Sequence, residues 1–259
     1  MARVSATGKG LVLGIDIGGS GIKGAPVDLQ KGVFARERIR IETPKKSTPQ
    51  AVAEIVAEVA AGFVDEVGDD SPVGVTVPAV VHHGVTKSAA NIDDSWIDAD
   101  ADALFTRVLG RPVVVMNDAD AAGQAEMHFG AGRDRDGVVL MTTLGTGIGS
   151  ALFLDGQLLP NTELGHLELD GKEAEHRAAS SVREDKDLSW KEWAKRLQRY
   201  YRHLEDLFWP DLFIVGGGVS KEADEFLPLL DLRTEIVPAQ LRNDAGIIGA
   251  AWAASHQKI

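Results

Sequence analysis

A seven-residue glycine-rich segment occurs twice in this chain, each time directly after an apolar run. Gly19-Ser20-Gly21-Ile22-Lys23-Gly24-Ala25 recurs as Gly145-Thr146-Gly147-Ile148-Gly149-Ser150-Ala151. The preceding apolar runs, residues 11–17 and 138–144, have the composition of buried strands. Each half then continues into a further strand, a turn, a helix and more strands. The repeat therefore predicts an α/β fold made of two similar lobes.

Turn and helix signals divide the two halves in a similar way. Residues 28–32 and Asp155-Gly156 are typical of turns between strands. In the first half, Thr48-Pro49 begins a helix with apolar residues at the helical period, and a strand follows over residues 73–77. In the second half, a helix over about residues 189–207 precedes a strand over residues 212–215. We expect lobes of residues 1–117 and 118–259, with the C-terminal helix packing back on the first.

The two glycine turns are candidate phosphate-binding sites. Glycine allows the backbone to turn sharply and to direct successive N–H groups at an anion. Ser20 and Thr146 add hydroxyl groups, and Lys23 adds a positive charge. The spacing matches neither G-x-x-x-x-G-K-[ST] nor G-x-G-x-x-G. A single turn of this kind is more often a simple hairpin connection, but two copies favour a phosphate chain held between two lobes.

A second candidate site lies where the strand over residues 113–115 ends in polar residues. Asn117 and Asp118 follow this strand and begin a helix that continues through Phe129. The carboxyl ends of strands in open α/β sheets face the ligand crevice, and a carboxylate placed there can accept a proton from a bound hydroxyl. Asp118 is therefore the candidate general base. The alternative is that Asn117 or Asp118 only caps the helix.

Composition excludes several classes of partner. The formal net charge of −12 argues against general binding to nucleic acids or anionic membranes, so an anionic ligand needs a confined local site. The absence of cysteine excludes disulfides, thiolate metal sites and a cysteine nucleophile. The sequence also has neither a signal peptide nor an apolar run of about 18 residues. We expect a soluble cytoplasmic protein.

Four motifs in order resemble those of known sugar kinases. Leu13-Gly14-Ile15-Asp16-Ile17-Gly18-Gly19-Ser20 and Thr143-Leu144-Gly145-Thr146-Gly147-Ile148-Gly149 resemble the two phosphate motifs of the sugar-kinase, Hsp70 and actin superfamily. Asn117-Asp118-Ala119-Asp120-Ala121-Ala122 and Glu163-Leu164-Gly165-His166 resemble the ROK sugar kinases. The resemblance covers almost the whole chain and is strongest to the polyphosphate glucokinase branch. It implies a duplicated actin-like (ribonuclease H-like) ATPase fold with two lobes around a cleft, and a homodimer.

The resemblance also implies roles for individual residues. Asp118 would deprotonate the 6-hydroxyl of glucose, and Asn117 and Asn91 would contact the sugar. Three further residues match positions that bind the remaining hydroxyls: Glu163, His166 and Glu175. The loop over residues 216–220 resembles one that lies against a nucleotide base or ribose. The residues expected to bind the phosphate donor are Asp16, Gly18, Gly19, Ser20, Gly21, Lys23, Gly145, Thr146, Gly147, Gly217 and Gly218.

Asp16 is the candidate ligand for Mg²⁺, either directly or through water, because phosphoryl transfer requires neutralisation of charge. An equally good alternative to direct coordination is a carboxylate satisfied by the loop that follows it. Many ROK proteins carry a zinc-binding cysteine cluster after the Glu-x-Gly-His segment. Residues 170–181 contain no cysteine, so we expect no such zinc site and assign His166 to the sugar.

A basic stripe is expected on the helix near residues 189–207. Its members, at positions i, i+4, i+8 and i+11, are Lys191, Lys195, Arg199 and Arg202. The usual explanation is the solvated face of an amphipathic helix. In a chain of net charge −12 such a stripe could also guide a long polyanion.

The expected activity is that of a glucokinase that uses polyphosphate, ATP or both and forms glucose 6-phosphate. One alternative is an ATP-dependent ROK kinase for mannose or another hexose. A less favoured alternative is an actin-like ATPase that does not act on a sugar. Asn117-Asp118 together with Glu163-x-x-His166 favours a sugar kinase, because an ATPase without a sugar substrate needs no such set of hydroxyl-binding groups.

Overall fold

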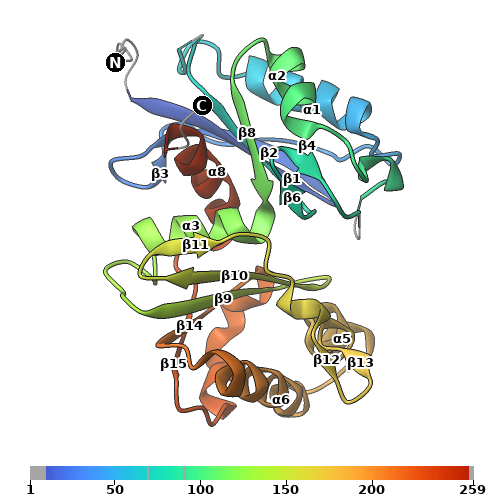
Figure 1. Cartoon of the computed structure of the whole chain (residues 1–259), viewed down its shortest axis with the longest axis vertical. Helices are drawn as coiled ribbons and strands as arrows, with labels where there is room; N and C mark the ends of the chain where they lie inside the picture. Colours follow the sequence, from blue (N-terminus) through green and yellow to red (C-terminus); the bar gives the residue numbers. More distant parts are fainter. Residues whose placement is uncertain (1–9, 69, 90–91, 257–259) are drawn as a thin grey trace. The chain divides into compact units, whose positions relative to one another are not determined.

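The computed structural model describes residues 10–68, 70–89 and 92–256, and it divides into two compact units (Figure 1). Unit 1 comprises the chain up to Ala125 together with the segment from Asp244 onward. Unit 2 comprises Glu126–Asn243. The division falls within a helix, eight residues beyond the expected boundary at Asn117, and the C-terminal helix belongs to unit 1.

Unit 1 contains a six-stranded sheet of order β3-β2-β1-β5-β8, with β4 paired to β2. Its strands are β1 (Leu11–Gly18), β2 (Gly21–Asp28), β3 (Val33–Phe34), β4 (Ile39–Ile41), β5 (Val73–Val77) and β8 (Val113–Asn117). β1 and β2 are antiparallel, whereas β1, β5 and β8 are parallel. The carboxyl ends of the three parallel strands therefore meet at one edge of the sheet, where β1 ends at the first glycine turn and β8 ends at Asn117.

Helices cover both faces of this sheet. The remaining elements of unit 1 are α1 (Pro49–Ala61), β6 (Val81–His82), β7 (Val85–Thr86), η1 (Asp94–Trp96), α2 (Ala101–Leu109), α3 (Asp118–Phe129, which continues into unit 2), η5 (Arg242–Asp244, at the second division) and α8 (Ala245–His256). Thr48 caps α1 by accepting a hydrogen bond from the amide of Ala51. Ile15 and Val75 bury their side chains in the core that α1 and α2 share with the sheet. α8 packs against β1 and β5.

Glycine is required where α8 meets the sheet. A Cβ atom at Gly14 of β1 would lie 1.9 Å from the carbonyl oxygen of Ile247, and one at Gly74 of β5 would lie 1.8 Å from that of Ala250. Real Cβ atoms do not approach so closely, so the helix can reach this distance only because both strand positions lack a side chain.

Unit 2 repeats the same arrangement with a five-stranded sheet of order β11-β10-β9-β14-β15. Its strands are β9 (Val138–Leu144), β10 (Ile148–Leu154), β11 (Gln157–Leu159), β14 (Leu212–Gly216) and β15 (Glu235–Pro238). The other elements are η2 (Leu164–His166), β12 (Glu168–Leu169), β13 (Lys172–Glu173), α4 (Glu175–Ala178), α5 (Ser180–Asp185), α6 (Trp190–Phe208), η3 (Gly218–Glu222), α7 (Ala223–Phe226) and η4 (Leu227–Leu229). Trp193, Tyr201 and Phe213 are fully buried in its core.

The strand orders confirm the predicted duplication. In each unit, a strand ends at a glycine turn, an antiparallel strand follows, and two later strands add in parallel on the other side. Both glycine turns join antiparallel strands, since Gly18 pairs with Gly21 and Leu144 pairs with Ile148. The candidate phosphate turn and the hairpin connection are therefore one and the same feature.

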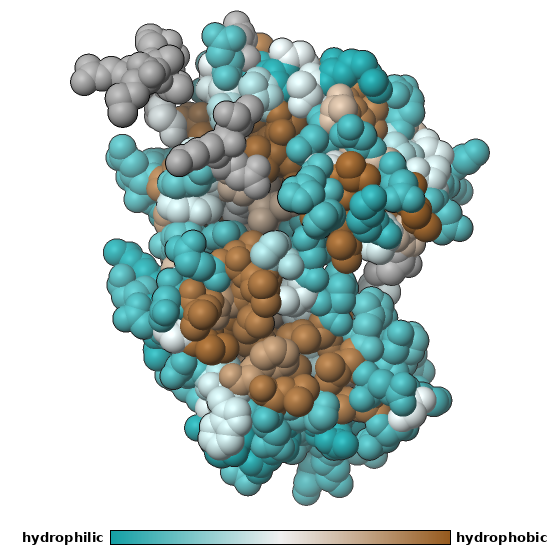
Figure 2. All heavy atoms as spheres, viewed as in Figure 1, coloured by the Kyte–Doolittle hydropathy of each residue, from teal (hydrophilic) through white to brown (hydrophobic). Residues whose placement is uncertain are grey.

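Unit 2 exposes an apolar patch over its strands on the face visible in Figure 2. Among the exposed large apolar residues are Leu154 at the end of β10 and Leu159 on the edge strand β11, which are 60% and 57% accessible. In the described part of the chain, no helix has the length and apolar character needed to cross a bilayer.

Candidate functional site

The first glycine turn lies beside cations that the sequence analysis did not single out. The carbonyl oxygen of Gly18 accepts a hydrogen bond from the hydroxyl of Thr43, and that of Ser20 accepts one from Arg40. Gly19 and Ser20 are exposed, and a hollow at this turn is lined by Gly19, Thr43 and Lys45, among others. The carbonyl oxygens of the turn would repel an anion, but they are bound to the side chains of Thr43 and Arg40. The open side of this hollow is therefore suited to an anion. Arg40 escaped prediction because its place beside the turn depends on the pairing of β4 with β2.

Asp16 and Lys23 face each other across the β1–β2 hairpin, and the carboxylate oxygen Oδ2 lies 3.7 Å from Nζ. The other oxygen of Asp16 accepts a hydrogen bond of 2.8 Å from the hydroxyl of Thr76, which is fully buried. Mg²⁺ in phosphoryl-transfer sites usually keeps several waters and binds one or two carboxylates plus substrate phosphates. A carboxylate with one oxygen held by Thr76 fits such an ion bound through water.

Asn117 caps α3 at the end of β8, which is the alternative that the sequence left open. Its Oδ1 accepts hydrogen bonds from the amides of Ala119 and Asp120 at 2.8 and 3.0 Å, and its Nδ2 donates to the carbonyl of Ala79 at 3.1 Å. The side chain is 8% exposed. Most of its hydrogen-bonding capacity is therefore used within the protein, which leaves one N–H for a ligand.

Asp118 is the first residue of α3 and is half-buried. Its Oδ1 accepts a hydrogen bond of 2.9 Å from the amide of Ala119. This contact fixes the carboxyl group at the carboxyl edge of the parallel strands, where sequence reasoning placed it. Asn91, the other expected sugar contact from this half of the chain, lies outside the described residues.

In unit 2, the three predicted hydroxyl-binding residues form one cluster. His166 Nε2 lies 3.6 Å from a carboxylate oxygen of Glu163, and its Nδ1 lies 4.0 Å from one of Glu175. Two further members of the cluster, Glu173 and His176, were not predicted. A carboxylate oxygen of Glu173 lies 3.4 Å from Nδ1 of His166 and 3.6 Å from Nδ1 of His176. Both lie in the short run Glu173-Ala-Glu-His176, but only the β12–β13 hairpin brings this run back to His166.

The backbone around this cluster is fixed by β10. A Cβ atom at Gly165, between Glu163 and His166, would lie 2.1 Å from the carbonyl oxygen of Ile148, so this position requires glycine. The hydroxyl of Ser150 accepts a hydrogen bond from the amide of Leu164 at 3.0 Å. The short helix η2 is therefore held directly against β10. This contact positions the side chains of Glu163, just before the helix, and of His166, its last residue.

Burial and charge act together on the carboxyl group of Glu163. Burial raises the pKa of Glu163, the negative charge of Glu175 raises it further, and His166 opposes both effects. Atoms of His166, Glu173 and Glu175 lie within 4.8 Å of one another, so these three groups could also hold a cation. The expectation that this segment forms no zinc site stays a prediction. The same acceptors and imidazole suit a sugar, which presents hydroxyl groups only.

The second glycine turn borders a separate hollow in unit 2, lined by residues that include Thr146, Ser181, Trp190 and Gly218. Ser181 anchors the turn, since its amide donates to the carbonyl of Gly145 at 3.1 Å and its hydroxyl donates to that of Thr146 at 2.7 Å. These contacts occupy the carbonyls of Gly145 and Thr146, and the amide of Gly145 donates to the carbonyl of Gly147 at 3.0 Å. In the described part of the chain, the turn amides left to bind an anion are those of Thr146 and Gly147.

Gly217 brings the predicted nucleotide loop next to this turn. Its φ is +85°, and a Cβ atom there would lie 2.2 Å from the carbonyl oxygen of Leu144, the last residue before Gly145. An unpredicted cation lines the same hollow: the guanidinium of Arg183 lies 3.6 Å from the ring centroid of Trp190. Among the residues that the structure describes, its buried Nε has no hydrogen-bond partner. No local sequence pattern marks Arg183, because its stacking depends on the turn between α5 and α6.

The basic stripe lies on α6 as predicted, but its members differ in their surroundings. Arg199 forms an ion pair of 3.2 Å with Asp170, and Arg202 forms one of 3.4 Å with the buried Glu205. Lys195 and Arg199 line a second hollow of unit 2, whereas Lys191 and Arg202 do not. A track that runs along all four residues remains a prediction.

Comparison with known proteins identifies the family. The model of the ROK family matches residues 12–181. The chain belongs to the ROK family. It is 54% identical over 241 residues to a polyphosphate glucokinase of Mycobacterium tuberculosis (strain ATCC 25618 / H37Rv). The aligned segment covers 93% of this chain and 89% of that relative.

Two solved structures extend the comparison. An inorganic polyphosphate/ATP-glucomannokinase from Arthrobacter sp. strain KM matches with a TM-score of 0.92 and 57% identity, over 96% of this chain and 99% of that one. A ROK family glucokinase from Streptomyces griseus, solved with glucose and AMPPNP, matches with a TM-score of 0.83 and 25% identity, over 96% and 100% of the two chains. These matches confirm the predicted actin-like sugar-kinase fold.

The ROK match contains both glycine turns, the end of β8 and the cluster around His166. It ends at Ser181, before α6 begins. The basic residues of α6 therefore lie outside the segment matched by the family model.

Proposed function

We propose that this ROK protein is a glucokinase that transfers a phosphoryl group from inorganic polyphosphate, ATP or both to the 6-hydroxyl of glucose. The observation that carries the proposal is the position of Glu175. It belongs to the cluster with Glu163 and His166, and it also accepts a hydrogen bond of 3.1 Å from the amide of Ile148, directly after the second glycine turn. A hydroxyl-binding cluster is thus joined to a phosphate-binding turn. The polyphosphate glucokinase and glucomannokinase relatives support both substrates.

Glucose would be held by acceptors and donors of the cluster. The carboxylates of Glu163 and Glu175 accept hydrogen bonds from sugar hydroxyls, and the imidazole of His166 can donate or accept. Asp118 would accept the proton of the 6-hydroxyl as its oxygen attacks the terminal phosphorus. The bond from that phosphorus to the bridging oxygen breaks, and the donor leaves as ADP or as a chain shortened by one phosphate.

The phosphate donor would be bound by the backbone amides of the two glycine turns, with the Ser20 and Thr146 hydroxyls. Lys23 and Arg183 supply positive charge, and the loop at Gly217-Gly218 would contact the nucleotide when ATP is the donor. Mg²⁺, when bound, neutralises charge on the donor phosphates, and Asp16 is the residue that would hold it through water.

A donor panel tests the proposal. Purified protein with fixed glucose is supplied with long-chain polyphosphate, tripolyphosphate or ATP, and glucose 6-phosphate is measured together with donor consumed. We expect stoichiometric product with polyphosphate, ATP or both. Donor hydrolysis that is independent of any sugar would instead support an actin-like ATPase. Faster turnover of mannose than of glucose would support the second alternative, a kinase for another hexose.

The homodimer implied by the family resemblance is also a proposal. The exposed side chains of Leu154 and Leu159 at the edge of the unit 2 sheet are one surface that a second chain could cover. Light scattering coupled to size-exclusion chromatography tests it, and a monomer mass at working concentration would contradict it.

A further inference from the structure

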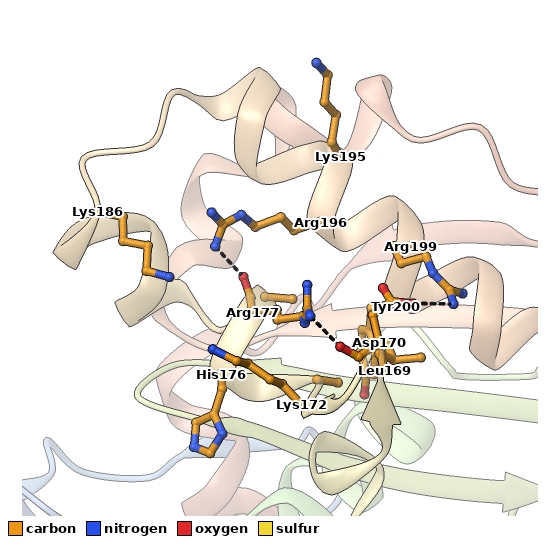
Figure 3. A pocket seen from close by; sticks show the side chains of 12 residues that line it. Leu169, Asp170, Lys172, His176, Arg177, Lys186, Lys195, Arg196, Arg199 and Tyr200 are labelled. Carbon is orange, nitrogen blue, oxygen red and sulfur yellow. Dashed lines mark hydrogen bonds and ion pairs between the residues drawn. The ribbon is translucent and has the colours of Figure 1, made fainter.

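A strongly basic pocket of about 400 Å³ lies in unit 2 between the β12–β13 hairpin, α4, α5 and α6 (Figure 3). Its positively charged lining residues come from all four of these elements or their ends: Lys172, Arg177, Lys186, Lys195, Arg196 and Arg199. Among the described residues, Asp170 is the only one whose carboxylate lines it. This surplus of cations occurs in a chain of net charge −12, so it is not a consequence of overall composition.

Few of these cations are neutralised by the protein. In the described part of the chain, Arg199 is the only one of the six in an ion pair, with Asp170 at 3.2 Å. Arg177 and Arg196 use one nitrogen each to bind backbone carbonyls, those of Asp170 at 2.8 Å and of Arg177 at 3.2 Å. These contacts fix the guanidinium groups without removing their charge. Like charges that line one pocket repel one another, and a bound anion offsets the free energy of this repulsion.

The side chains are arranged to share a ligand. In Figure 3, Lys186 from α5 and Arg196 from α6 point toward one another across the pocket, with Arg177 between the helices and the hairpin. Lys195 contributes its stem to the lining, and its amino group points away from the pocket. Guanidinium groups and ammonium groups are the usual partners of phosphate oxygens.

The basic pocket is close to the hollow at the second glycine turn. Ala178 lines the basic pocket and Ser180 lines the hollow at the turn, and two residues of chain span at most about 7 Å. The short helix α5 borders both, because Arg183 lines the hollow at the turn and Lys186 lines the basic pocket. A ligand held at Thr146 that extends over α5 reaches the basic pocket.

We propose that the basic pocket binds the phosphates of an inorganic polyphosphate chain that follow the group held at the second glycine turn. The proposal rests on the proposed function, because it assumes that the donor is bound at that turn. A polyphosphate carries negative charge along its whole length, whereas ATP ends in a nucleoside and has no phosphates left for a second site. Simultaneous binding at two neighbouring sites raises the affinity for long chains without new contacts at the first site.

The site differs from the predicted track along α6. Lys195 and Arg199 belong to it, together with Arg196 of the same helix. The other three cations come from α4, the end of α5 and the hairpin, which the sequence does not bring near α6. Arg202 is outside it and is bound to Glu205 and to the carbonyl of Asp231. The polyanion is therefore expected to leave the donor site across the helix α6 at Lys195 and Arg199, and not along its length.

The test is a charge-reversed variant, Lys186→Glu with Lys195→Glu. Neither lysine forms an ion pair or a side-chain hydrogen bond in the described part of the chain, so the fold should be retained. The matched control, Lys31→Glu with Arg133→Glu, changes net charge equally at side chains that are 73% and 70% exposed and line none of these pockets. We expect the pocket variant to raise the KM for long-chain polyphosphate about tenfold, with the KM values for glucose, ATP and tripolyphosphate within about twofold of wild type. The control should match wild type with every donor.

Calorimetric titration with long-chain polyphosphate in the absence of glucose separates the pocket from the reaction. The pocket variant should bind long chains about tenfold more weakly than wild type and the control. Equal binding by all three proteins would overturn the proposal even if glucose 6-phosphate is formed. An equal loss with ATP and with polyphosphate would also overturn it, because the change would then affect the shared donor turn. If wild type phosphorylates glucose from no donor, the proposed function fails, and the titration still decides whether the pocket binds polyphosphate.

Discussion

Glu175 accepts a hydrogen bond of 3.1 Å from the backbone amide of Ile148, and this contact joins the cluster around His166 to the second glycine turn. The approach is tight, because a Cβ atom at Gly147 would lie 2.4 Å from the same carboxylate oxygen. Under the proposed function, this one side chain would affect the binding of both the sugar and the phosphate donor.

Two substitutions at Glu175 should separate these effects. Glu175→Gln keeps an oxygen that can accept from Ile148 but removes the charge, so we expect a higher KM for glucose and little change in the donor KM. Glu175→Ala removes the acceptor too, which costs about 1–3 kcal/mol for the unpaired amide and should raise both KM values. Steady-state kinetics, with glucose and the phosphate donor varied in turn, measures both KM values. Identical behaviour of the two variants would show that the contact with Ile148 has no part in donor binding.

Asp118→Asn should nearly abolish turnover while glucose still binds. The amide retains the shape and an acceptor for the amide of Ala119, but it cannot take the proton of the 6-hydroxyl. General-base catalysis typically contributes about 10²- to 10⁴-fold, so kcat should fall within that range. Calorimetry with glucose is the control for binding. Activity within a few-fold of wild type would remove Asp118 from the role of base.

Asp16→Asn should increase the Mg²⁺ concentration needed for half-maximal activity. The amide can still accept the hydrogen bond from Thr76, but it lacks the charge that attracts a hydrated cation. Removal of Mg²⁺ with a chelator should stop turnover of wild type, and added Mg²⁺ should restore it. The matched variant is Thr76→Val, which keeps the carboxylate and should have a smaller effect on the Mg²⁺ requirement. An unchanged requirement in Asp16→Asn would place the ion elsewhere.

Glucose binding should depend on pH through Glu163. Burial raises the pKa of this carboxyl group, so the folded protein holds the proton to a higher pH than the unfolded chain does. The contribution of Glu163 to the free energy of unfolding therefore falls as pH rises between the ordinary pKa of glutamate and the raised one. Glucose binding should change in the opposite direction, because the carboxylate is the better acceptor.

The measurement is the KM for glucose across that pH window, in wild type and in Glu163→Gln. We expect the wild-type value to fall as pH rises and the variant value to be higher and flatter. A wild-type slope that survives in Glu163→Gln would assign the titration to another group of the cluster.

Gly74→Ala should destabilise unit 1. The added methyl group would lie 1.8 Å from the carbonyl oxygen of Ala250, and backbone atoms in a packed helix cannot move aside cheaply. Overpacking of this kind costs about 1–3 kcal/mol and occasionally more. The control is Gly19→Ala, because no atom of the described residues lies within 4 Å of a Cβ added there. This substitution should change the free energy of unfolding by less than about 0.5 kcal/mol. Urea unfolding measures the free energy of unfolding of both variants. Equal values for Gly74→Ala and Gly19→Ala would contradict the close approach of α8 to the sheet.

Local sequence signals predicted most of the elements. The strand expected over residues 73–77 is β5, the helix expected from Thr48-Pro49 is α1, and the helix expected near residues 189–207 is α6 with a capping box at Ser189. Asp155 and Gly156 adopt φ of 49° and 75°, as a tight hairpin turn requires. These features depend on neighbours in the chain, so the sequence contains the information directly.

Single residues were harder to assign, because one side chain can serve two roles. Asn117 was expected to contact the sugar or to cap a helix, and its two bonds to the amides of Ala119 and Asp120 show that it caps α3. Asp16 was expected to bind a metal or to be satisfied locally, and it is bound by Thr76, which comes from a different strand. No local pattern links residues 60 positions apart.

The sequence by itself determined the duplication, the two glycine turns and the motif residues of the ROK family, because periodicity and short motifs are properties of neighbouring residues. Only the tertiary structure decided which groups share a site. Glu173 joins His166 through a hairpin, Arg183 stacks on Trp190, and Arg40 reaches the first glycine turn. The basic pocket likewise combines three cations of α6 with cations from α4, the end of α5 and the β12–β13 hairpin, and the packing of these elements sets their distances. Such groupings follow from the burial of apolar faces elsewhere in each unit, and the polar residues themselves carry no local sign of them.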